Sequence, residues 1–211
     1  PVVRENRQVQ TPIDAFLLAR LEDRGLNFSP VADRVSQVRR VTVDLTGLPP
    51  TPKAVRQFVD DRRPGAWQRL VNRLLSSPRY GERWGRHWLD AAGYADSEGY
   101  SDDDQLRLSA FRFRDYVVRS FNEDRPFDQF IIQQLAGDEL VPTPGKNLQP
   151  RQIELLTATG FLRMAPDGTG SSGVDAVVAR NEVVADTIRI VSTSLLGLTV
   201  GCARCHDHRY D

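Results

Sequence analysis

The sequence predicts an all-α fold, and three observations lead to this prediction. Apolar residues recur at the i, i+3, i+4 spacing of an amphipathic helix through almost all of the 211 residues. Serine, threonine and proline stand where many of these segments begin, and glycine stands where two of them end, as helix capping requires. The one alternating stretch, RVTVDL at residues 40–45, lies inside a longer helical pattern and so gives no evidence for a strand.

Nine helical segments and two loops make up the predicted order of elements. The first segment begins behind Thr11-Pro12 and ends at Gly25, and the second runs from Ser29-Pro30 to the GLPPTP stretch. The remaining segments are marked by apolar residues within 55–59, 67–75, 78–89, 111–121, 126–135, 153–161 and 183–198. Loops are predicted at residues 137–150 and 165–173. The expected architecture is an irregular multi-helix domain with long loops.

Length, charge and hydropathy limit the class of protein. A chain of 211 residues suits one domain, and we expect residues 1–211 to form a single domain that is a fragment of a longer chain. The 28 basic and 28 acidic residues balance, so there is no general reason to expect nucleic acid as a partner. No run of about 18 apolar residues occurs, and no transmembrane segment is therefore predicted.

Cysteine and histidine are concentrated at the end of the chain. Both cysteines, Cys202 and Cys205, and two of the three histidines lie in the last twelve residues. The string Cys-Ala-Arg-Cys-His at 202–206 has the spacing of c-type haem attachment. Two thiols about one helical turn apart can each form a thioether with a haem vinyl group, and His206 then supplies an axial imidazole to the iron. The motif predicts one covalently attached haem c and electron transfer through it.

Other interpretations of the motif stay open. A redox dithiol of thioredoxin type would need a preceding strand, which the pattern does not predict. A structural zinc site would take both cysteines, one of His206 or His208, and His87, and would make the chain a metal-stapled structural or binding module of a cell-surface protein. A plain disulfide would leave His206 unexplained. A peroxidase-like haem enzyme would need an open position on the iron.

There are three candidates for the second axial position of the haem iron: His87, Met164 or an open site. Trp84 stands three residues before His87 and Trp88 directly after it, so we expect the three rings to share one helix face. Such a face would form an aromatic wall against a porphyrin edge. Trp84 and Trp88 are therefore predicted as cofactor-binding residues and His87 as the distal metal ligand.

An acidic cluster precedes the middle of the chain. Its members are Asp96, Glu98, Asp102, Asp103 and Asp104. Their spacing is not that of an EF-hand loop, so a solvated acidic loop is one interpretation and a Ca²⁺ site is the other.

Several long stretches carry a family resemblance. They include PIDAFLLARLEDRGL, RRVTVDLTGLPPTP, FRFRDYVVRSFNEDRPFDQFIIQQLAGD and LGLTVGCARCHDHRYD, and they cover nearly all of residues 12–211. These stretches resemble the cytochrome-c-like domain of planctomycete surface proteins, the PSCyt2 or DUF1549 family. Cys202, Cys205 and His206 match the C-x-x-C-H motif of that family, whereas Gly93 stands where an arginine is frequent.

The resemblance implies an exported protein in which a DUF1553 domain follows the haem motif. Because haem attachment requires extracytoplasmic machinery, the expected location is the periplasm or the cell surface. The expected partners are redox proteins or neighbouring haem domains.

Overall fold

The computed structural model describes residues 1–4, 6–100, 104–142, 147–171 and 173–207. Within these ranges the protein is helical and has no strand; its one β-feature is an isolated antiparallel bridge between Ser97 and Leu106. The all-α prediction is confirmed, and the alternating stretch at 40–45 lies in a helix as expected. None of the described helices is long and apolar enough to cross a membrane.

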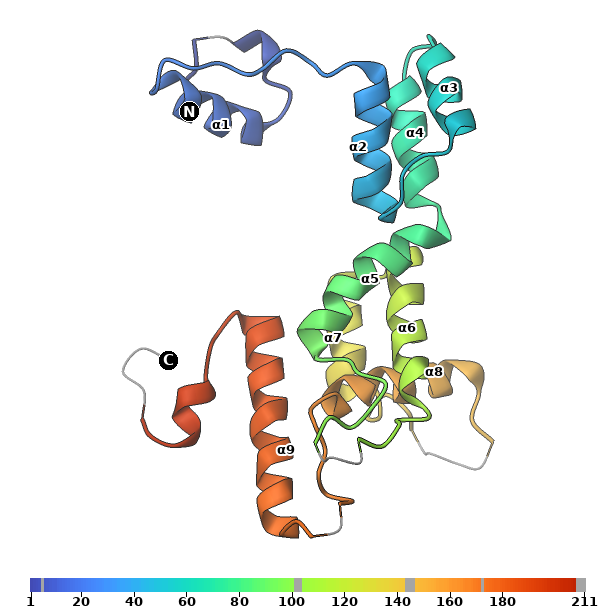
Figure 1. Ribbon diagram of the computed structural model, residues 1–211, viewed down its shortest axis with the longest axis vertical. Helices are drawn as coiled ribbons and strands as arrows, with labels where there is room; N and C mark the ends of the chain where they lie inside the picture. Colours follow the sequence, from blue (N-terminus) through green and yellow to red (C-terminus); the bar gives the residue numbers. More distant parts are fainter. Residues whose placement is uncertain (5, 101–103, 143–146, 172, 208–211) are drawn as a thin grey trace.

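The helices follow one another in the order shown in Figure 1. The α-helices are α1 (Pro12–Glu22), α2 (Arg34–Thr46), α3 (Pro52–Asp60), α4 (Ala66–Leu75), α5 (Pro78–Ala92), α6 (Ala110–Asn122), α7 (Phe127–Ala136), α8 (Pro150–Ala158) and α9 (Ala176–Val191). The shorter elements are the 3-10 turns η1 (Asn6–Gln8), η2 (Thr159–Arg163) and η4 (Gly201–Arg204) and the π-helical turn η3 (Ser192–Leu196).

Local capping explains where the predicted boundaries hold and where they shift. The hydroxyl of Thr51 accepts the N–H of Ala54 at 3.2 Å and begins α3, as the sequence predicts. Helix α2 begins later than the predicted Ser29-Pro30 start, because the carboxylate of Asp33 accepts the N–H of Ser36 at 2.9 Å. Helix α9 begins earlier than its apolar pattern indicated, behind the N-cap residue Asp175.

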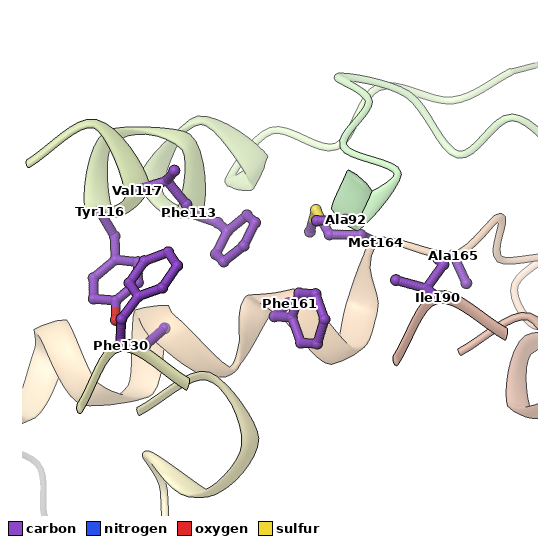
Figure 2. Packing of buried hydrophobic residues seen from close by; sticks show 10 residues of the cluster. Ala92, Phe113, Tyr116, Val117, Phe130, Phe161, Met164, Ala165 and Ile190 are labelled. Atoms are coloured by element: carbon purple, nitrogen blue, oxygen red, sulfur yellow. The ribbon is translucent and has the colours of Figure 1, made fainter. Parts of the chain in front are cut away.

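Two apolar cores lie within the described ranges. The smaller core joins α2, α3 and α4 and contains Val38, Phe58, Ala66, Leu70 and Leu74. The larger core joins α5, α6, α7, α8, η2 and α9, and Figure 2 shows how its side chains converge. Its buried members are Ala92, Phe113, Tyr116, Val117, Phe130, Ala158, Phe161, Met164, Ala165 and Ile190.

Helix α5 contacts elements of both groups. It packs against α2 and also has an extensive contact with α6. Figure 1 shows α5 running from the α2–α4 group down to the elements of the larger core. In the same view α9 stands at one side of that core, and η4 lies beyond α9.

Two glycines let α5 and α6 approach closely. A β-carbon on Gly81 would lie 2.4 Å from the backbone oxygen of Val118, which no real contact allows, whereas one on Gly85 would lie 3.4 Å from Val117. The close approach also allows the N–H of Gly81 to donate a hydrogen bond of 2.8 Å to the side-chain oxygen of Asn122. This contact fixes the crossing of the two helices, since it needs the backbones to be close.

Candidate functional site

The two cysteines lie on one turn at the end of the described chain. Cys202 is the second residue of η4, and Cys205 is the C-cap residue directly after it. Both side chains are exposed and both are free thiols. The N–H groups of Cys205 and His206 point back to the carbonyl oxygen of Cys202, at 3.2 and 3.4 Å. Residues i and i+3 of a 3-10 turn are eclipsed, so the two cysteines stand one above the other.

Helix α9 supports this turn. Arg204 of η4 forms an ion pair with Glu182 of α9, with 3.6 Å between nitrogen and oxygen. A groove of about 390 Å³ lies between the two elements, and Ile188 and Arg189 of α9 face Val200 and Arg204 across it. The turn that carries the thiols therefore borders a concave surface that is partly apolar and partly charged, with Asp186 beside the two arginines in its lining.

His206 follows the second cysteine and is exposed. Its Nδ1 atom lies 3.0 Å from the backbone oxygen of Asp207. His208, the other histidine of this stretch, lies outside the described residues. Every described residue from 201 to 207 is exposed, so the described part of the chain does not bury the segment that carries the motif.

The three rings predicted to form an aromatic wall on α5 have different surroundings. Trp84 and His87 contact each other, with ring centroids 5.5 Å apart, and His87 is exposed. The structure does not add Trp88 to this pair. The indole N–H of Trp88 donates to the buried Gln134 at 2.8 Å, and its ring packs against Phe130 and Phe161 at the edge of the larger core.

Met164, the other candidate axial ligand, is a core residue. Only 5% of its surface is exposed, and it packs in the larger core with Phe161 and Phe113. Its backbone oxygen accepts a hydrogen bond of 3.2 Å from the guanidinium of Arg107. Because its side chain fills core space, the thioether is not presented to the surface on which the cysteines lie.

These placements contradict the predicted function, electron transfer through a covalently attached haem. In the part of the chain that the structure describes, no three His, Cys, Asp or Glu side chains come together to hold a metal ion. His87 therefore does not join Cys202 and Cys205, and the alternative of a zinc-stapled module fails for the same reason. A C-x-x-C-H string specifies only which residues are neighbours in the sequence. The walls of a haem pocket and the second ligand of the iron must come from the rest of the fold.

Two of the described members of the acidic cluster accept hydrogen bonds from nearby residues. The Asp96 carboxylate accepts the phenol of Tyr94 at 2.6 Å, and the Asp104 carboxylate accepts the N–H of Gly99 at 2.9 Å. This hydrogen bond lowers the pKa of Asp104. Residues 101–103, which include two of the predicted acidic residues, lie outside the described ranges, and the Ca²⁺ site stays a prediction.

The contact between Tyr94 and Asp96 leads to a testable pH dependence. Burial, with the hydrogen bond to Asp96, raises the pKa of Tyr94 to about 12. A phenol in the unfolded chain ionises near pH ~10. The folded state thus holds this proton more tightly, and the resulting stability is complete below about pH 10 and lost as the pH rises through about 12.

Urea denaturation of the wild type and of a Tyr94→Phe variant measures this pH dependence of the stability. Between about pH 9 and about pH 11 the wild type should lose more stability than the variant. A difference between the two proteins that stays the same from neutral to alkaline pH would show that Tyr94 does not titrate as expected.

Sequence reasoning missed the residues of α9 that support the cysteine turn. Glu182 pairs with Arg204 and also accepts the phenol of Tyr100 at 2.5 Å. It therefore ties the cysteine turn to the segment before α6. No motif marks Glu182, because its partners lie 22 residues after it and 82 residues before it in the sequence.

The comparisons with known proteins gave one finding. The family model described as PSCyt2: Protein of unknown function (DUF1549) matches residues 12–211. A search of the curated proteins and a search of the solved structures found no match.

Proposed function

The chain belongs to the PSCyt2 (DUF1549) family, and we propose that its function is thiol–disulfide exchange with a partner protein. One observation carries this proposal: the two cysteines are both free, both exposed and one turn apart. No strand precedes the cysteines in the described chain, so the proposal rests on the turn itself and not on a thioredoxin-like fold.

The geometry of the turn supports an intramolecular disulfide. The rise of a 3-10 helix is about 2 Å per residue, so eclipsed Cα atoms three residues apart are separated by about 6 Å. Disulfides form between Cα atoms about 4.4–6.8 Å apart. Cys202 and Cys205 can therefore be joined with little movement of the backbone.

The exchange balances without any further cofactor. The thiolate of one cysteine attacks a disulfide of the partner, which forms a mixed disulfide and releases one partner sulfur as a thiol after it takes up a proton. The second cysteine then attacks the mixed disulfide, closes the Cys202–Cys205 disulfide and releases the second partner thiol. Two electrons pass from the dithiol to the partner, and the reverse sequence oxidises a partner dithiol.

The groove beside the turn supports a protein as the partner. Ile188 and Val200 offer apolar surface. Arg189 pairs with Asp186 and Arg204 pairs with Glu182, and the remaining N–H groups of the two guanidiniums can donate to a backbone carbonyl. A peptide that lies in this groove would bring a cysteine at its end close to η4. We place the exchange in the periplasm or at the cell surface, where protein disulfides persist.

The test is a redox titration of the protein in mixtures of reduced and oxidised glutathione, followed by alkylation of free thiols and mass measurement. In the wild type both thiols should disappear together, as expected for a two-electron couple. The variants Cys202→Ser and Cys205→Ser should instead accumulate a mixed disulfide with glutathione. An Ala203→Ser variant is the matched control, because it adds a hydroxyl to the same turn but keeps both thiols.

The proposal fails if the wild type takes up two glutathione molecules and forms no internal disulfide. It also fails if the internal disulfide forms but reduced glutathione cannot reopen it, because the pair would then be a static structural bridge.

A further inference from the structure

A second concave surface lies far along the chain from the cysteine turn, between α2, the start of α4 and α5. It is a pocket of about 650 Å³, and its lining includes Arg39, Arg40, Asp44, Trp67 and Arg83. We propose that this pocket, which we call the arginine pocket, binds a small organic anion that carries at least two negative groups and a flat ring.

The three arginines of the pocket have no partner in the described chain. The side chains of Arg39, Arg40 and Arg83 form no ion pair and no hydrogen bond with described residues. Two other arginines of the same group of helices differ: Arg63 and Arg69 both pair with Asp61 at 2.8 Å. The positive charge of the pocket is therefore available to a ligand.

Arg83 packs against the end of α2. Its Cδ atom would lie 3.0 Å from a β-carbon on Gly47, so its side chain packs closely over this glycine, and a larger residue there would shift it by a few tenths of an ångström. The Nε atom of Arg83 is shielded from solvent and has no hydrogen-bond partner in the described chain. The terminal nitrogens of the same guanidinium are not among the buried atoms without a partner, and they can donate to an oxyanion in the pocket.

The charge of the surrounding helices favours an anion. Residues 33–75 contain nine basic and four acidic residues, although the whole chain has a net charge of zero. A local excess of positive charge raises the concentration of anions near the surface. Two guanidinium groups on one turn of α2 and a third on α5 can bind more than one oxyanion group.

Trp67 gives the pocket an aromatic wall. It packs edge to face on Phe58, with ring centroids 6.2 Å apart, and 45% of its surface stays exposed. Val43 also lines the pocket and is exposed. Aromatic faces stack on planar ligands, and volumes of about 300–1,000 Å³ are usual for small-molecule sites. The carboxylate of Asp44 can accept a hydrogen bond from a hydroxyl or amino group of the ligand.

The test measures binding by isothermal titration calorimetry with ADP as the probe. Pyrophosphate, which has the charge without the ring, and adenosine, which has the ring without the charge, are the comparison ligands. ADP should bind with one molecule per chain and at least about tenfold more tightly than either comparison ligand. The double variant Arg39→Gln/Arg40→Gln should weaken ADP binding by at least about tenfold.

A matched control removes the same charge elsewhere on these helices. Arg56→Gln/Arg73→Gln replaces two exposed arginines of α3 and α4 that do not line the pocket, and it should change ADP affinity by less than about twofold. Circular dichroism of each variant checks that the helices are retained.

Three results would overturn the proposal. The first is no binding of ADP, and the second is equal weakening in the two double variants, which would indicate a diffuse effect of charge. The third is that a single-stranded oligonucleotide binds more tightly than ADP and competes with it, which would assign the surface to nucleic acid instead of a small anion. None of these results bears on the thiol chemistry, because the cysteines lie on η4.

Discussion

Replacing Gly81 with alanine is expected to destabilise the protein by about 3 kcal/mol. The new methyl group would lie 2.4 Å from the backbone oxygen of Val118 and 2.6 Å from the side chain of Asn122. Neither can move freely, since the first belongs to the backbone of α6 and the second accepts the N–H of Gly81. Helices α5 and α6 must therefore separate, and the packing between them is lost. Urea denaturation followed by circular dichroism measures the change.

Gly85→Ala is the control for this prediction. It stands one turn later on the same helix, where a methyl group would meet Val117 at 3.4 Å and need only a small adjustment. Alanine is favoured over glycine inside a helix by about 1 kcal/mol, and this gain is the same at both positions. The Gly85 variant should stay within about 1 kcal/mol of the wild type. If the two variants lose equal stability, the close crossing at Gly81 does not limit the packing.

Phe161→Ala is expected to have the other large effect, a loss of about 3–5 kcal/mol. Phe161 is only 1% exposed and packs at the centre of the larger core, where Trp88 stacks against it with ring centroids 5.8 Å apart. Its removal leaves a cavity between η2, α5 and α9 that the surrounding helices cannot fill completely. The free energy of unfolding is again the quantity to measure.

Phe127→Ala provides the comparison for this loss. The same atoms are removed at the start of α7, where the ring is 63% exposed and meets Trp88 only edge to face. We expect less than about 1 kcal/mol there, because little apolar area returns to water. A cost at Phe161 no larger than the cost at Phe127 would show that the larger core does not depend on the η2 ring.

Most of the fold follows from signals that act over a few residues. The hydroxyl of Thr51 and the left-handed Gly47, at φ 71°, set the start of α3 and the end of α2 as the sequence predicts. The start of α2 was predicted too early because the Ser29-Pro30 pair is a valid start signal on its own. Asp33 competes with it and makes the hydrogen bond that the first turn needs.

The candidate site was harder to predict because it depends on packing between distant segments. The C-x-x-C-H string shows that the two thiols are close but contains no information on what covers them. Trp88 is predicted to share a helix face with Trp84 and His87, and Met164 is a candidate ligand because of its thioether; in the fold the first donates to Gln134 and the second lies in the larger core. Both residue types are used more often for packing than for ligation, and only the fold separates the two uses.

The position of α5 decides how this protein can be divided. The helix has α2 against one part of it and α6 against another, and it contributes Arg83 to the arginine pocket and Ala92 to the larger core. A fragment that ends before Pro78 would lack the Arg83 of the arginine pocket. A fragment that begins after Ala92 would leave α6 without α5, the helix with which it has its most extensive contact. A segment chosen for separate expression should therefore contain all of residues 78–92, and neither half should be expected to behave as an independent folding unit.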